Sequence, residues 1–195
     1  MRDQILNFLK EIDEQLADYA QPGEYLDLYL IGRSSLILRL DLALTTDDVD
    51  IVRMSTSRGD QNLEERAIEL FGEGTPNALR LGLHLERVSQ GLPPLPQGFK
   101  KRCTEELQEE WRVIRPKFLE FNDFAVTKLK RFSAKDRRDL KILCDKGLIT
   151  AAGLEKAIDN AYVFHADEDE DSHRKDAYGA FRKVCAYLET GEAAF

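Results

Sequence analysis

Residues 28–52 read LYLIGRSSLILRLDLALTTDDVDIV, and this stretch decides how the rest of the chain can be arranged. An apolar strand leads to Gly32, an apolar helical segment follows, and a second strand carries Asp48 and Asp50. Because successive side chains of a strand alternate between its faces, these two aspartates are expected on the same face. Neighbouring carboxylates repel each other, and a bound divalent cation is the usual way to stabilise them. The stretch therefore predicts a phosphate-and-metal arrangement.

The phosphate half of this prediction rests on the turn at Gly32. A glycine lets the backbone approach a phosphate closely, and Ser34 and Ser35 stand where a helix begins with its unpaired N–H groups. Helix capping by serine is the alternative explanation. The aspartates also have an alternative, because TTDD at residues 45–48 is common turn chemistry. Asp47 is expected in the turn or on the opposite side of the strand, and it is not predicted to bind the metal.

Gly32-x-Ser34 followed by Thr46-x-Asp48-x-Asp50 resembles the nucleotidyltransferase fold superfamily, and within it the small bacterial proteins of the AbiEii toxin type. Residues 123–140, DFAVTKLKRFSAKDRRDL, look like the segment of those proteins in which a helix lysine precedes a lysine–aspartate turn and a further aspartate. The resemblance implies a transferase, dependent on Mg²⁺ or Mn²⁺, that moves NMP from an NTP to an acceptor hydroxyl on RNA or protein. It also implies a role as one component of a toxin–antitoxin pair, with a cognate antitoxin as partner.

The resemblance assigns roles to residues of both stretches. Asp48 and Asp50 would be catalytic and hold the metal, while Gly32, Arg33 and Ser34 would contact the phosphates of the nucleotide. The family usually has Gly-Gly-Ser at this turn. The arginine in the middle either crowds the triphosphate or binds it through its guanidinium group, and both interpretations stay open.

In the second stretch, Lys128 would bind a phosphate, and Asp136 and Asp139 would orient the nucleotide or the basic residues around it. These three residues lie within a basic run at 128–141, which could meet RNA or a nucleotide. Salt bridges on a solvated helix are the alternative. The acidic run at residues 167–171 is expected to be a solvated loop, or to cover the basic run.

A nucleotidyltransferase commonly needs a third carboxylate on a neighbouring strand. Glu86 is the best candidate, because alternating leucines predict a strand over residues 79–88 and place Glu86 on its polar face together with His84. An exposed edge strand with solvent-facing polar residues is the alternative. Glu86 is therefore a candidate third acid, which would complete the metal site or take a proton.

The predicted fold is α+β: a nucleotidyltransferase-like mixed sheet flanked by helices, with a helical C-terminal half. Its strands are expected at residues 26–31, 48–53 and 81–88, with one or two more at 113–121 interrupted at Pro116. Thr104 is expected to cap a short helix to Trp111. Residues 1–121 would form the α/β core, and residues 122–195 a helical region packed on it.

Composition restricts the class of protein further. The 195 residues are 43% hydrophobic and 33% charged, and the net charge of -8 argues against a general nucleic-acid binder. There is no DNA-binding signature, no apolar run long enough for a membrane span and no signal peptide. Three widely spaced cysteines predict reduced thiols in a cytoplasmic protein. The alternative function is that of a catalytically degenerate member that acts as a protein-binding module.

Overall fold

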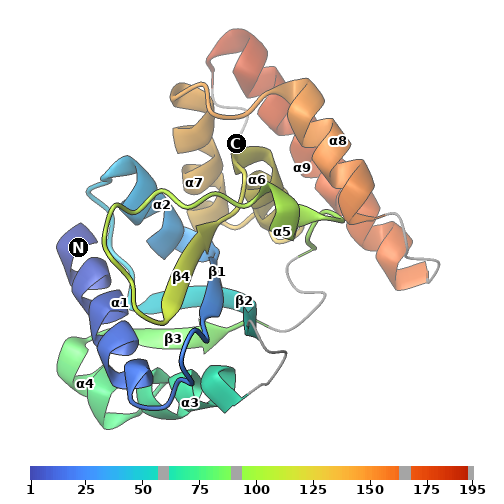
Figure 1. The fold of residues 1–195 in the computed structure, drawn as a ribbon. Helices are drawn as coiled ribbons and strands as arrows, with labels where there is room; N and C mark the ends of the chain where they lie inside the picture. The colour runs from blue at the N-terminus through green and yellow to red at the C-terminus, as the bar shows by residue number, and fades with distance from the viewer. Residues whose placement is uncertain (57–61, 89–93, 163–167, 193–195) are drawn as a thin grey trace. The chain divides into compact units, whose positions relative to one another are not determined.

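Figure 1 shows the computed structural model of the chain, which describes residues 1–56, 62–88, 94–162 and 168–192. The chain divides into two compact units. The first consists of Met1–Gln90 and Cys103–Phe118, and the second of Gly91–Arg102 and Leu119–Phe195. The domain boundary predicted at residue 121 stays a prediction. In the parts of the chain described, no helix is long and apolar enough to cross a membrane.

The first unit is built on a mixed four-stranded sheet of order β3-β2-β1-β4. Strand β1 pairs antiparallel with β2 and parallel with β4, and β2 pairs parallel with β3. The predicted fold class is therefore confirmed, and three of the predicted strands are neighbours as expected. The strands are β1 (Leu26–Leu30), β2 (Asp48–Thr56), β3 (His84–Arg87) and β4 (Ile114–Phe118).

Amphipathic helices pack on this sheet and complete the core of the first unit. Helix α1 packs against α2 and α3, α2 packs against β2, and α3 packs against β3. Leucines 26, 28 and 30 of β1 are fully buried, and the rings of Phe8 and Phe71 meet edge to face with centroids 5.7 Å apart. The helices of this unit are α1 (Arg2–Ala17), α2 (Gly32–Leu40), α3 (Asn62–Phe71) and α4 (Pro76–Leu81).

A buried aspartate ties the first helix to the last strand of this unit. Asp13 is 5% exposed, and its carboxylate accepts hydrogen bonds from the backbone N–H groups of Arg112, Val113 and Ile114 at 2.8–3.2 Å. Hydrogen bonds to a charged acceptor are stronger than neutral ones. The carboxylate therefore holds the start of β4 in place beside β1.

The second unit is helical in the residues described. Helix α6 packs against α7, α8 and α9. Ser133 and Thr150 cap α7 and α8, since each side chain accepts a hydrogen bond from the first turn of its helix. Glu120 caps α6, since its side chain accepts hydrogen bonds from the N–H groups of Asn122 and Asp123. The helices are α5 (Phe99–Arg102), α6 (Phe121–Leu129), α7 (Ala134–Asp145), α8 (Ala151–Ala161) and α9 (Glu168–Thr190).

The predicted strand over residues 79–88 is wrong in its first half. Thr75 accepts a hydrogen bond from Ala78 N–H, and Pro76 follows at the first helical position, so residues 76–81 form α4. Gly82 then ends the helix with a φ of +66°. The alternating leucines that predicted a strand are also compatible with one helical turn and a short strand.

Two more local predictions are wrong. Residues 104–111 are not helical, because Thr104 exchanges two backbone hydrogen bonds of 2.9 Å with Phe118 along the edge of the sheet. Pro116 does not interrupt β4. It lies two residues before Phe118, so its missing N–H faces the same outer edge and removes no bond to β1.

The predicted acidic loop is also wrong in its second part, since α9 already begins at Glu168. Asp167, the first residue of that predicted loop, lies outside the described residues.

Candidate active site

The turn between β1 and α2 and the first residues of β2 build the candidate site. Ile31 N–H donates a 2.9 Å hydrogen bond to the carbonyl oxygen of Asp50, which places the β1–α2 turn directly beside β2. On the other side of β2, Asp48 pairs in register with His84, and Asp50 pairs with Glu86. Because both pairs lie in one parallel ladder, the polar side chains of the two strands meet at one place.

Three carboxylates converge there. Asp48, Asp50 and Glu86 each offer an oxygen, and these oxygens lie within 4.8 Å of one another. The two aspartates are half-buried, and the glutamate is exposed. Three negative charges at this spacing repel one another, and carboxylate oxygens are the ligands that Mg²⁺ and Mn²⁺ prefer. By donor set and spacing, these residues, called the acidic cluster below, fit a divalent cation.

Gly32 lies against the side chain of Asp50, which leaves no room for a side chain at position 32. Its φ is +67°, and an ideal Cβ at this position would lie 1.8 Å from Asp50 Oδ2. The Asp50 carboxylate therefore lies directly against the backbone at the first residue of α2, which has nine residues. The positive end of a helix dipole stands behind this backbone, so the place favours anions.

The remaining residues of the turn are positioned differently. Ser34 is fully buried, and its hydroxyl donates to the carbonyl oxygen of Ile31 at 3.4 Å. The Ser35 hydroxyl donates to the carbonyl oxygen of Gly32 at 3.0 Å. Arg33 is half-buried. Both serine hydroxyls thus donate to backbone carbonyl oxygens, and neither caps the helix, because the N-cap residue is Ile31 and makes no side-chain cap hydrogen bond.

Thr46 was not singled out from the sequence as a site residue, but it orients one carboxylate. It is 8% exposed, and its hydroxyl donates to Asp48 Oδ1 at 2.5 Å and contacts the Asp48 carbonyl oxygen at 3.3 Å. The signal was the Thr-x-Asp spacing, which places a hydroxyl two residues before the carboxylate. Asp47 is exposed, and its carbonyl oxygen accepts from His84 N–H at 3.3 Å.

Lys128, Asp136 and Asp139 come together in the second unit, as a buried ion cluster between α6 and α7. Lys128 Nζ lies 3.8 Å from Asp136 Oδ1 and 3.7 Å from Asp139 Oδ2, and none of the three side chains is more than 8% exposed. Arg131 adds a forked contact to Asp136 at 2.8 and 2.9 Å.

The carboxyl of Asp136 is held in its charged form. Burial alone would raise its pKa, but hydrogen bonds from Arg131 and Ser133 and the charge of Lys128 lower the pKa to about 2. Asp136 also closes a capping box with Ser133 at the start of α7. The observed contacts of these residues therefore stabilise the junction of α6 and α7, and their nucleotide-binding role stays a prediction.

Comparison with protein families decides the class. A family model described as "Nucleotidyltransferase of unknown function (DUF6036)" matches residues 7–189. The chain belongs to this family. Comparison with curated proteins and with solved structures gives no match. The range that the DUF6036 model matches contains both the acidic cluster and the buried ion cluster, so both belong to the part of the chain that the family shares. The predicted resemblance to nucleotidyltransferases is confirmed at this level.

Proposed function

We propose that the chain transfers NMP from an NTP to an acceptor hydroxyl in a reaction that depends on Mg²⁺ or Mn²⁺. The observation that carries this proposal is the acidic cluster, because its three carboxylate oxygens lie within 4.8 Å of one another beside the N-terminus of α2. Membership of a nucleotidyltransferase family supports the same class of reaction. A phosphate site and a metal site thus adjoin each other in the first unit.

In this proposal Asp48, Asp50 and Glu86 hold the cation. When bound, the cation would offset negative charge on the triphosphate and on the departing pyrophosphate. The backbone at Gly32 and the guanidinium group of Arg33 bind phosphate oxygens at the positive end of α2. Because Gly32 has no side chain, the Asp50 carboxylate can lie against the backbone at the first residue of α2, next to the proposed phosphate site.

The acceptor hydroxyl then attacks the α-phosphorus. A bond forms between the acceptor oxygen and the α-phosphorus, the bond from the α-phosphorus to the bridging oxygen breaks, and pyrophosphate leaves with that oxygen. Glu86 is the most exposed of the three acids, and it takes the proton of the attacking hydroxyl. Positioning and charge stabilisation carry most of the rate.

The finer parts of the proposal concern the whole chain. Residues 1–121 are assigned to the transferase core and residues 122–195 to a helical region, and the nucleotide-binding role of Lys128, Asp136 and Asp139 in that region is the one that the resemblance implies. The AbiEii-like resemblance also implies that the acceptor hydroxyl lies on RNA or protein, and that a cognate antitoxin binds the chain. Growth arrest on expression of the chain, relieved by Asp50→Asn, would support a toxin role, and growth unaffected by the wild-type chain would argue against it.

A protein-binding role without catalysis is the second candidate. It is favoured by Arg33, which replaces the middle glycine of the usual family turn, and by Ser34, whose hydroxyl is buried and directed at Ile31. A calorimetric titration with each NTP, with and without Mg²⁺, distinguishes the two. Catalysis requires nucleotide binding that strengthens with Mg²⁺, whereas a protein-binding module shows no heat with any NTP.

The decisive experiment is label transfer from NTP with a radioactive α-phosphate to total RNA or to total protein. We expect one NTP to label one acceptor pool when Mg²⁺ is present. The Asp48→Asn/Asp50→Asn variant should transfer no label, because it lacks the charges that hold the cation. If no NTP labels either pool although the chain is folded, the enzyme proposal fails.

A further inference from the structure

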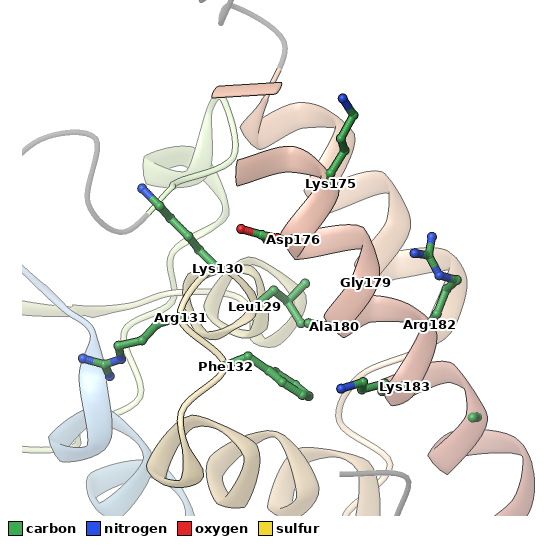
Figure 2. Close-up of a pocket in the computed structure, with 11 residues that line it drawn as sticks. Leu129, Lys130, Arg131, Phe132, Lys175, Asp176, Gly179, Ala180, Arg182 and Lys183 are labelled. Carbon is green, nitrogen blue, oxygen red and sulfur yellow. The ribbon is translucent and has the colours of Figure 1, made fainter. Parts of the chain in front are cut away.

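A second charged feature lies in the second unit, in a groove between the α6–α7 turn and α9 (Figure 2). The groove has a volume of about 740 Å³, and its lining carries five basic side chains and one acidic side chain. In a chain of net charge -8 this is a local reversal of sign. Salt screens charges over about 8 Å, so a nearby ligand responds to these local charges more than to the net charge. The basic groove is lined by Lys130, Arg131, Phe132, Lys175, Arg182 and Lys183.

Much of this positive charge is not neutralised by the protein. Lys130, Arg182 and Lys183 pair with no carboxylate among the residues that the structure describes. Arg182 and Lys183 are exposed. Arg131 pairs with the buried Asp136, yet its side chain is 69% exposed. The groove thus presents several cations to whatever occupies it.

An aromatic ring lies among these cations. Phe132 is half-buried and adopts a φ of +45°, which is unusual for a bulky residue and costs about 1–2 kcal/mol. Lys183 Nζ of α9 lies 5.6 Å from the centroid of the Phe132 ring, and the guanidinium group of Arg137, on α7, lies 5.9 Å from the same centroid. Figure 2 shows the ring turned towards Lys183 and the lining of α9. The strained backbone therefore holds an aromatic surface in the groove.

We infer that the basic groove binds a single strand of RNA, with its phosphates on Lys130, Arg182 and Lys183 and a base on Phe132. Cations that follow a backbone, together with an aromatic side chain on which a base stacks, are the features of single-strand binding. An acidic peptide would satisfy the cations but has no base for the ring. Unpaired RNA is the commonest single strand in a cell, and its bases are free to stack.

The inference deepens the proposed function, since it names RNA rather than protein as the class of acceptor. It also goes beyond the basic run at residues 128–141, because α9 contributes Lys175, Arg182 and Lys183 to the lining, and Lys128 is buried outside the groove.

Binding can be measured without catalysis. The probe is a fluorescent oligouridylate of about 16 nucleotides, the upper site size of common single-strand modules. Fluorescence anisotropy of the full chain, without NTP, gives Kd at several salt concentrations. Three cations that each meet one phosphate predict a slope of log K against log salt of about -2.

The test variant is Arg182→Gln/Lys183→Gln, and its matched control is Lys146→Gln/Lys156→Gln. Lys146 and Lys156 are exposed residues of the same unit and lie outside the groove. Their replacement by glutamine removes the same amount of positive charge as the test variant does. Each phosphate contact raises the affinity for the oligouridylate about fourfold at ~0.15 M salt. The test variant loses two such contacts, so it should bind about fifteenfold more weakly, and its slope of log K against log salt should fall to about -0.7. The control should keep both values of the wild-type chain.

Phe132 gives an independent measurement. Phe132→Leu should weaken oligouridylate binding by about fivefold or more without changing the salt slope, because stacking is lost and phosphate contacts remain. Phe132→Tyr keeps an aromatic ring and should bind as the wild-type chain does. Thermal unfolding of each variant checks that it is folded.

The inference is overturned if oligouridylate does not bind, or if the test and control variants weaken binding equally. Tighter binding of deoxyoligothymidylate, or equal binding of polyglutamate, would also overturn it in favour of DNA or of acidic peptides. Failure of the proposed function gives a different result. The Asp48→Asn/Asp50→Asn variant should still bind oligouridylate, so RNA binding without label transfer would leave the groove assigned and remove only the catalytic proposal.

Discussion

Gly32→Ala is the sharpest perturbation of the candidate site. An ideal Cβ at this position would lie 1.8 Å from Asp50 Oδ2, whereas carbon–oxygen contacts in proteins lie at about 3.3 Å. The Asp50 carboxylate must therefore retreat by about 1.5 Å. A misplacement of about 1 Å in a reacting geometry can cost on the order of a hundredfold in rate. We expect label transfer to fall by at least that factor.

The same substitution also strains the backbone, and the strain has to be separated from the collision. With a φ of +67°, any residue with a Cβ loses about 1–2 kcal/mol in the left-handed region, which lowers Tm by about 5 °C in a chain of this size. Gly74→Ala is the matched control, because its φ is +77° and a Cβ there would meet nothing within 4 Å. The control should show a similar loss of stability and full transfer.

A double-mutant cycle completes the test. In an Asp50→Ala background, Gly32→Ala should destabilise the chain less than it does in the wild-type background, because the carboxylate oxygen that it would collide with is gone. Thermal unfolding followed by circular dichroism measures the stability term, and label transfer measures the rate. The reasoning is refuted if Gly32→Ala transfers label as fast as Gly74→Ala does.

Three further predictions concern charge. Asp48→Asn/Asp50→Asn should abolish the Mg²⁺-dependent part of NTP binding in calorimetry while Tm stays within a few degrees. Glu86→Gln should lower label transfer by on the order of a hundredfold if it is the third acid, whereas the exposed Glu73→Gln should have no effect. Asp136→Asn should destabilise the chain by about 2 kcal/mol near neutral pH, since the pKa of the folded state, about 2, lies below the ordinary value of 3.8. That contribution to the free energy of unfolding is fully present above pH 3.8 and is lost as the pH falls towards 2. Urea unfolding across this range should therefore show the stabilities of the wild-type chain and the Asp136→Asn variant converging.

Contrary outcomes are equally definite. Unchanged Mg²⁺-dependent binding in the double asparagine variant would place the metal elsewhere. Equal transfer by the Glu86 and Glu73 variants would return Glu86 to the role of a surface residue. A stability difference for Asp136→Asn that stays constant down to pH 2 would mean that its carboxyl gains no stabilisation in charged form.

Period-two spacing accounts for much of what the sequence could predict about the site. Asp48 and Asp50 share a face because strand geometry requires it. Their proximity to Glu86 depends on the register between β2 and β3, which pairs Asp50 with Glu86. No pattern within either segment states that register, so sequence supported Glu86 as a candidate and could not place it. The close approach of Gly32 to Asp50 is hidden for the same reason, since it depends on pairing between strands.

Short elements are where sequence patterns failed. Leucines 79, 81, 83 and 85 alternate, but the first two belong to α4, whose six residues are too few to establish a helical period. Thr75-Pro76, a helix start, was the better signal. Thr104 had the chemistry of a cap, yet it satisfies its backbone by pairing with Phe118 at a sheet edge. Competition between a local cap and a distant strand cannot be decided from the local residues.

The hydrogen bonds of Asp13 to residues 112–114 determine when the first unit can form during synthesis. Strand β4 pairs with β1, and its first residue, Ile114, donates one of these hydrogen bonds to Asp13. This strand follows the segment Gly91–Arg102, which belongs to the second unit. A nascent chain that ends at residue 90 lacks both β4 and residues 112–114. The carboxylate of Asp13 therefore has none of its three backbone donors at that stage. The two units interleave along the polypeptide. Cutting the chain after residue 90 or after residue 118 therefore separates one of the units into two fragments. A genetic fusion or a split reporter is better placed at a terminus.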